Sequence, residues 1–140
     1  MSLFNVLDTA SSGMSAQTVR MNTTSSNLAN ADTVSSSVEQ TYRARHPVFQ
    51  AIAEQYGFGP DAGRGSGVQV QGIVESAAPL RSEYRPEHPL ADEAGYIYRP
   101  NVNPVEEMAN MISASRSYQT NVEVVNASKQ MLLRTLSLGQ

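Results

Sequence analysis

A few residues in this sequence are of types that can do chemistry, but their spacing assembles neither a catalytic site nor a metal site. His46 and His88 each precede a proline, and neither has a second metal-ligating residue at a usual spacing. The acidic residues of Asp92–Glu93 and of Glu106–Glu107 are chain neighbours rather than facing carboxylates. General acid–base catalysis needs a group positioned within reach of the reacting proton. The sequence therefore predicts neither an enzyme nor a metal site.

A glycine-rich stretch, GFGPDAGRGSG at residues 57–67, is the remaining candidate, because such loops can hold phosphate groups. No Lys-Ser or Lys-Thr follows it and no strand–helix pattern surrounds it, so we interpret it as a loop or hairpin connection. The chain has no cysteine, which excludes disulfides and thiolate chemistry. Its Lys and Arg are scattered and its net charge is −3. We expect no cofactor, no small-molecule substrate and no nucleic-acid partner.

Residues 1–31 read as one helix that cannot stand alone. They carry only two charges, Asp8 and Arg20, and thirteen of the 22 residues from Thr9 to Asn30 are Ser, Thr, Asn or Gln. These residues are mediocre helix formers, and a lone helix of this composition is marginal in water. Two rows at a spacing of seven indicate a helix that packs along another helix. The main row is Leu7, Met14, Met21 and Leu28, and a weaker companion row is Leu3, Ala10, Gln17 and Thr24.

Residues 32–103 read as a small β-rich module. GVQVQGIV alternates as a half-buried strand does, with an irregularity predicted at Gly72. YRARHPVF and AGYIYRP are two further strand candidates. Four of the prolines, Pro79, Pro86, Pro89 and Pro100, break the region into short pieces.

Residues 104–140 give the clearest helix pattern. Asn103 is a suitable N-cap, Pro104 suits the first helical position, and Glu106 has the spacing of a capping box. A helix from residue 104 to 138 would be about 50 Å long, at about 1.5 Å per residue. One row at a spacing of seven is Met111, Tyr118, Val125 and Leu132, and an adjoining, interrupted row is Met108, Val122 and Leu136.

These three parts predict an α+β fold. The two long terminal helices would form an antiparallel coiled-coil-like pair, with the β-rich module at its far end. A two-stranded coiled coil in water normally flanks its seam with Glu and Lys, but here the flanks are Ser, Thr, Asn and Gln. We infer helices that are enclosed by copies or relatives of themselves, as in a polymer; the alternative is a polar face in solvent. In isolation we expect the termini to be largely disordered.

Two stretches carry a resemblance to a known family. SNLANADT (26–33) and RPNVNPVEEMANMISASRSYQTNVEVVNASKQMLLRTLSLGQ (99–140) resemble the bacterial flagellar axial rod and hook proteins, and more narrowly the proximal rod proteins of the basal body. The central stretches YRARHPVF, GVQVQGIVES, YRPEHPLAD and GYIYRPNVN match in the same order, whereas VSSSVEQT (34–41) departs from the family pattern. The motif residues are Asn27, Leu28, Asn30, Asn101, Asn103, Glu107 and Met108.

The resemblance implies a structural subunit of the flagellar rod, the drive shaft that crosses the periplasm. Such a chain would polymerise with itself and with other rod subunits, and contact rotor-ring and rod-junction proteins. It would be made in the cytoplasm and exported by the flagellar type III apparatus, since no cleavable secretory signal is visible. The alternative is a coiled-coil adaptor or export chaperone of the flagellar system, which would be expected to have a more charged helix surface.

Two short segments have specific expected roles. Phe4 and Leu7 are the nearest match to an export signal that binds the flagellar export gate; alternatively, they only close the end of the helix pair. Asn27 and Asn30 are expected where the inner helix gives way to the next layer, bonding backbone groups there or reaching adjacent subunits. The simpler alternative is a helix cap at Asn30.

Overall fold

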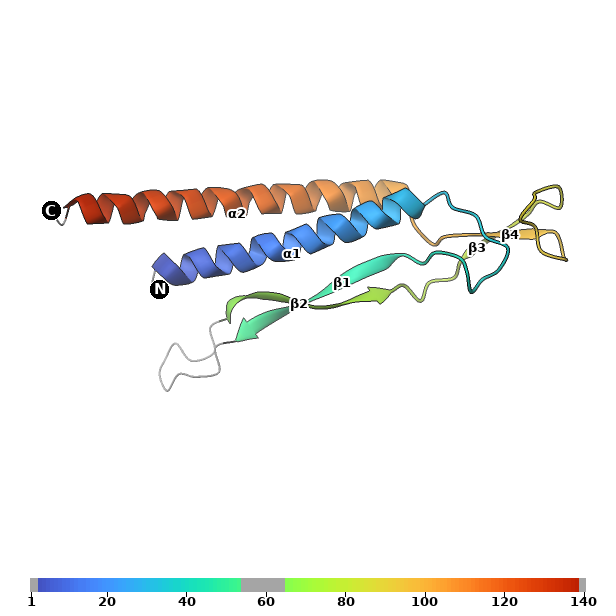
Figure 1. The fold of residues 1–140 in the computed structure, drawn as a ribbon, viewed down its shortest axis with the longest axis horizontal. Coiled ribbons are helices and arrows are strands. Elements are labelled where there is room, and N and C mark those ends of the chain that lie inside the picture. Colours follow the sequence, from blue (N-terminus) through green and yellow to red (C-terminus); the bar gives the residue numbers. More distant parts are fainter. Residues whose placement is uncertain (1–2, 54–64, 139–140) are drawn as a thin grey trace.

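The computed structural model describes residues 3–53 and 65–138, and its architecture is α+β, as predicted. Two long helices lie side by side, and four strands form two separate antiparallel pairs next to them (Figure 1). In chain order the elements are α1 (Leu3–Asn30), β1 (Arg45–Ala53), β2 (Gly65–Glu75), β3 (Arg81–Tyr84), β4 (Tyr96–Arg99) and α2 (Pro104–Leu138).

The two helices run side by side in opposite directions, with the beginning of α1 and the end of α2 at the same end of the molecule (Figure 1). Arg20 donates a hydrogen bond to Asn110, and the Gly13 backbone lies against the Asn121 side chain, which fixes the relative position of the helices. The 35 residues of α2 outnumber the 28 of α1, and the end of α2 extends past the beginning of α1. The knob-and-hole packing of a coiled coil remains a prediction.

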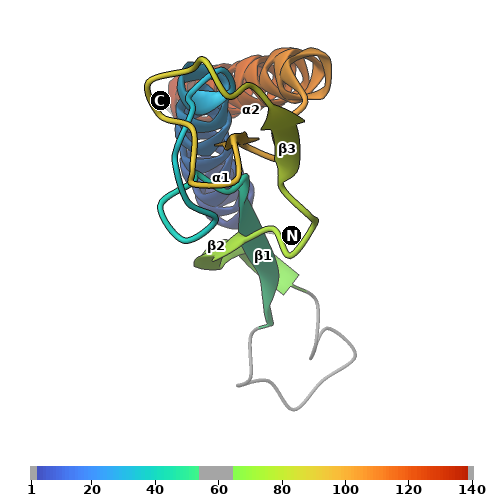
Figure 2. The ribbon, with the colours of Figure 1, turned by 90° about the vertical axis from the view of Figure 1, so that its right-hand side faces the viewer.

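Strands β1 and β2 form a two-stranded ribbon along the opposite side of α1 from α2 (Figures 1 and 2). A register shift falls between Val48 and Phe49, where Val48 pairs with Gly72 and Phe49 with Val70, so Gln71 is the extra residue of a bulge. The predicted irregularity at Gly72 is therefore confirmed. Most of the predicted glycine-rich connection lies outside the described residues.

Strands β3 and β4 form a short hairpin beyond the end of the helix pair at which α1 ends and α2 begins. Its turn places Gly95 at a φ of 83°, and an added Cβ there would meet the Tyr84 ring at 2.9 Å, so this position requires glycine. The sequence patterns did not predict β3, which has only four residues with a single partly buried one.

The buried core is small and concentrates in two places. At the junction between helices and strands, the most buried side chains are those of Ala44, Ile97, Pro100 and Val102. Between and along the helices they are those of Ala10, Ala16 and Ala114. No described helix is long and apolar enough to span a membrane.

Candidate assembly interface

The most buried row of α2 in the seam of the helix pair consists of small and polar side chains. Glu107, Ala114 and Ser128 are at most 4% exposed, and with the partly buried Asn121 they form a row at a spacing of seven. On α1 the most buried positions include Ala10 and Thr24, which lie in one row at a spacing of seven. Alanine and serine contribute little apolar area, so this row lets the helices come close together but adds little hydrophobic stabilisation of its own.

One layer of the seam shows how close the helices come. An added Cβ at Gly13 would lie 2.8 Å from the Asn121 amide nitrogen, so only glycine fits there without a shift. Nearby, the Gln17 side-chain oxygen is buried and has no hydrogen-bond partner within the described part of the chain. A buried unsatisfied oxygen costs roughly 1–3 kcal/mol. This layer therefore fixes the alignment of the two helices but contributes little to their stability.

The Asn27 side chain joins α1 to the start of β1. It is 1% exposed, its amide group donates to the Arg45 carbonyl at 2.8 Å, and its oxygen accepts from the Arg45 N–H at 2.9 Å. The same oxygen accepts a hydrogen bond from the Tyr42 hydroxyl at 2.8 Å. The amide thus pairs with Arg45 as a neighbouring strand would, satisfying backbone groups that burial would otherwise leave unpaired.

Asn101 makes the corresponding connection from the segment before α2. Its side-chain oxygen accepts from the Ala44 N–H at 2.8 Å, and its amide group donates to the Ala78 carbonyl at 2.9 Å. Successive N–H groups of an extended chain point to opposite sides. Asn27 and Asn101 therefore hold residues 44 and 45 from two sides; we call this arrangement the asparagine junction, made of Asn27, Asn101 and the backbone of Ala44 and Arg45.

The other two motif asparagines serve helix ends. The Asn30 amide donates to the Ser26 carbonyl one turn earlier at 2.8 Å, and the Asn30 carbonyl accepts from the Thr33 hydroxyl. The Asn103 side chain accepts from the Val105 N–H at 3.2 Å, which is an N-cap interaction for α2. Asn27 therefore reaches the next layer, whereas Asn30 acts within its own segment.

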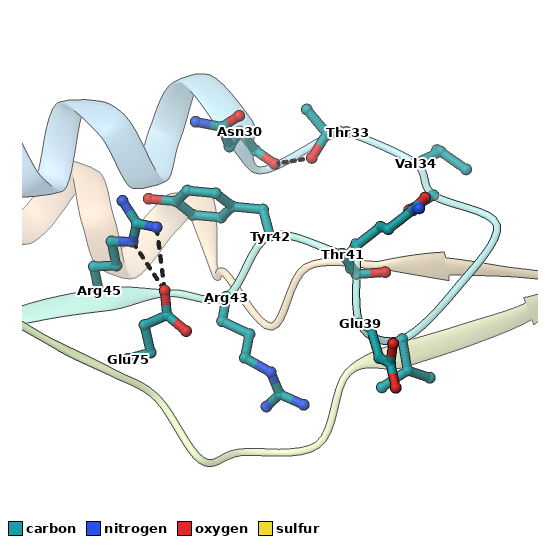
Figure 3. A pocket seen from close by; sticks show the side chains of 12 residues that line it. Asn30, Thr33, Val34, Glu39, Thr41, Tyr42, Arg43, Arg45 and Glu75 are labelled. Carbon is teal, nitrogen blue, oxygen red and sulfur yellow. Dashed lines mark hydrogen bonds and ion pairs between the residues drawn. The ribbon is translucent and has the colours of Figure 1, made fainter.

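A polar pocket of about 750 Å³ lies beside the asparagine junction, between residues 30–43 and the start of the ribbon (Figure 3). The Arg45 guanidinium lies 5.5 Å from the centre of the Tyr42 ring and pairs with the Glu75 carboxylate at 3.1 Å. Both side chains of this ion pair are about half exposed, so it stabilises little. No described cluster of three His, Cys, Asp or Glu residues could hold a metal ion.

The β3–β4 turn is organised by one carboxylate. The Asp92 side chain accepts from the N–H groups of Tyr96 at 2.8 Å and Ala94 at 3.0 Å, and from the Tyr98 hydroxyl at 3.1 Å. The Tyr96 N–H is the main reason that the pKa of Asp92 lies below its usual value, because it stabilises the ionised form. The bond to Asp92 raises the pKa of Tyr98.

The outer surface of α2 is rich in exposed apolar side chains. Val105 is 71% exposed, Ile112 56%, Leu133 57% and Leu136 69%. Single exposed apolar residues are ordinary, but a concentration of them on one helix marks an interaction surface. This surface and the weak seam together describe a helix pair that needs further protein around it.

Both ends of the chain match family models of flagellar rod proteins. Residues 7–34 match the model described as flagella basal body rod protein, and residues 93–138 match the flagellar basal body rod FlgEFG protein C-terminal model. The whole chain is also 51% identical over 140 residues to the flagellar basal-body rod protein FlgC of Escherichia coli O6:H1, with both chains fully covered.

The chain belongs to the FlgC family of flagellar basal-body rod proteins.

FlgC proteins of two other bacteria also match this chain over its whole length. The FlgC of Salmonella typhimurium is 49% identical over 140 residues, with all of both chains covered. The FlgC of Borreliella burgdorferi is 39% identical over 151 residues, covering 100% of this chain and 99% of the relative. The chain is thus a structural rod subunit of the flagellar basal body that assembles with other rod components, and the prediction that it is not an enzyme is confirmed.

Most of the predicted interface residues of this FlgC chain lie partly buried. They are Leu7, Met14, Met21, Leu28, Met111, Tyr118, Val122, Val125 and Leu132. Two others, Met108 and Leu136, are 47% and 69% exposed, so they do not contribute to the seam of a single subunit. The most buried row of α2 went unnoticed in the sequence because it contains no large apolar residue, although its spacing of seven could have revealed it.

The predicted export residues sit at the free end of the helix pair. Phe4 is 69% exposed and Leu7 is partly buried. Sequence reasoning missed Tyr42 and Arg45, which complete the site around Asn27, because no local pattern distinguishes residues that meet only after folding.

Proposed function

We propose that the helix pair is the polymerising part of this FlgC subunit, packed against copies of itself and against other rod subunits. The exposed apolar side chains of α2 carry this proposal, because a rod subunit has neighbours that would cover them. The polar residues beside these apolar side chains, mostly Ser, Thr, Asn and Gln, support it as well, since neighbours could contact them without burying unpaired charge.

The proposed division of labour follows the three parts of the chain. Residues 1–31 and 104–140 would form the inner tube as a coiled-coil-like pair, and residues 32–103 would form an outer or connecting layer. The asparagine junction would hold these layers at a fixed angle, because each of its two amides bonds backbone groups of another segment. A fixed angle is what a subunit needs to transmit torque from the rotor ring along the rod.

We further propose that the chain is synthesised in the cytoplasm, exported unfolded by the flagellar type III apparatus without a cleaved signal peptide, and assembled in the periplasm. Phe4 and Leu7 would bind the export gate. The marginal helix pair supports this route, because a weakly stable chain opens at little cost. Rotor-ring and rod-junction proteins would be further partners.

The experiment that tests the polymerising role replaces Ile112 by Asp in cells that lack the native subunit. A charge at this exposed position is harmless in a free monomer but costs several kcal/mol when neighbours bury it. We expect normal export, no rod and no swimming. Glu123→Gln, a change at another exposed position of α2, is the control. Full swimming of Ile112→Asp would contradict the proposal.

A further inference from the structure

One long side of the helix pair presents large apolar side chains that no other described element covers. On α2 this side is formed by Met108, Ile112, Val122, Lys129, Leu133 and Leu136. Four of the apolar residues are 47–69% exposed, and Val122 at the middle of the row is partly buried. We call this side the open face.

The position of the open face follows from helix geometry. The hydrogen bond between Arg20 and Asn110 lies on one flank of the seam. Ser12 and Asn27 bond to the ribbon from other positions of α1 that also lie away from the open face. Met108 lies across the buried row from Asn110, at about 100° per residue. On α1, by the same geometry, Ser11 and Thr18 lie on the opposite flank of the buried row from Arg20. They therefore share the open face with Met108.

The α1 half of the open face is different in character. From Asp8 onwards its side chains are short and exposed, namely Asp8, Ser11, Ser15, Thr18 and Ser25, and the exposed Phe4, seven residues before Ser11, lies at its N-terminal end. The α2 half carries large side chains, so the two halves are complementary in shape. Each half also contains one charged residue, Asp8 on α1 and Lys129 on α2, and these are opposite in sign.

Asp8 and Lys129 also lie at similar positions along the axis of the helix pair. Gly13 lies beside Asn121, and Asp8 precedes Gly13 by five residues, so Asp8 is level with residues near Asn126. Lys129 is then only about 5 Å further along the helix, at about 1.5 Å per residue, which a lysine side chain easily spans.

We propose that the open face binds the open face of a second copy of this chain before rod assembly. A twofold axis parallel to the helices places α1 of one copy over α2 of the other at unchanged level. The small α1 stripe then covers the apolar α2 stripe, and Asp8 of each copy meets Lys129 of the other. Every helix in the resulting four-helix bundle is antiparallel to its neighbours, which is a common bundle topology.

The area available is sufficient for a specific dimer. Two helices about 10 Å wide and about 42 Å long present about 800 Å² per subunit, the size of a standard protein–protein interface. The interface is isologous and closes on itself, so it cannot propagate into a fibre. The dimer goes beyond the proposed rod role: it covers the apolar side chains of α2 while the chain is outside the rod.

Sedimentation of the full-length chain at micromolar concentration tests the proposal. We expect a dimer, and we expect Lys129→Asp to raise its dissociation constant about tenfold or more, because like charges then oppose each other. The double variant Asp8→Lys with Lys129→Asp should restore the native constant. Arg116→Asp, an exposed charge reversal off the open face, should change nothing. The proposal would be overturned if the chain were a monomer at all concentrations. It would also be overturned if the dissociation constant of the dimer were the same in all these variants.

Cross-linking gives a second measurement that needs no disruptive change. The chain has no cysteine of its own, so Ser11→Cys and Val122→Cys can be made as separate single variants. These positions are level with each other across the proposed dimer. An oxidised mixture of the two variants should give the mixed disulfide dimer, whereas Ser11→Cys mixed with Arg116→Cys should not. Equal yields from both mixtures would contradict the arrangement.

Discussion

The asparagine junction and the helix pair are built on different principles. At the junction, Asn27 and Asn101 satisfy the backbone groups of Arg45 and Ala44 within the chain, and Ile97 and Val102 in the segment before α2 are buried. In the helix pair the most buried row of α2 is small and polar, the Gln17 oxygen is unsatisfied, and apolar residues lie on the outside. The junction is thus complete within one subunit, whereas the helix pair acquires its full set of contacts only from other chains.

The largest effect is expected from a charge in the helix pair. Val125→Asp places a carboxylate at a partly buried position of α2, where an unpaired charge costs several kcal/mol. We expect rod assembly and swimming to be lost while export to the periplasm continues. Gln130→Asp puts the same charge at an exposed position of α2 and should swim normally. Full motility of the Val125→Asp variant would show that the helix pair does not take part in rod assembly.

A smaller but local effect is expected at the junction. Asn27→Ala leaves the Arg45 backbone groups and the Tyr42 hydroxyl without their partner, and we expect a loss of about 3 kcal/mol in the free energy of unfolding. Urea unfolding followed by tyrosine fluorescence measures it. Asn22→Ala, at an exposed position of the same helix, should lose less than about 0.5 kcal/mol. Equal losses from the two variants would show that the Asn27 hydrogen bonds do not stabilise the fold.

The close approach at Gly13 can be measured by a double-mutant cycle. Gly13→Ala gains up to about 1 kcal/mol in helix propensity, but its Cβ meets the Asn121 side chain. In an Asn121→Ala background the clash is absent, so we expect the same change to stabilise by about 1 kcal/mol. Additive single changes would mean that the helices lie further apart than the structure shows.

The smallest effect is expected at the β3–β4 turn. The folded-state pKa of Asp92 is lowered, so the contribution of its carboxylate is fully present above the usual value of 3.8 and is lost as the pH falls through the lower, folded-state pKa. Exchange of the Tyr96 amide proton should therefore become faster relative to the rest of the strand as the pH drops below 3.8. In Asp92→Asn this acid dependence should be absent.

The sequence predicted the elements better than it predicted their contacts. The rows at a spacing of seven and the Asn103–Pro104 start indicated both helices, because helix periodicity and caps are local properties. The Asn27–Arg45 and Asn101–Ala44 bonds could not be predicted, since they join residues that are distant in the chain. The seam row with Ala114 and Ser128 escaped because apolar patterns favour large residues, whereas close helix packing needs small ones.

Hydrogen exchange of the isolated chain, at a concentration low enough to keep it monomeric, tests the central contrast most directly. The N–H groups of Ala44 and Arg45 bond the two junction asparagines, so we expect them to exchange about a hundredfold more slowly than those of residues 5–20 of α1. Protection along α1 should decline from Asn27 towards the N-terminus. Slow exchange of equal strength over the whole of residues 3–30 would contradict the account, because the helix pair would then be complete without neighbours.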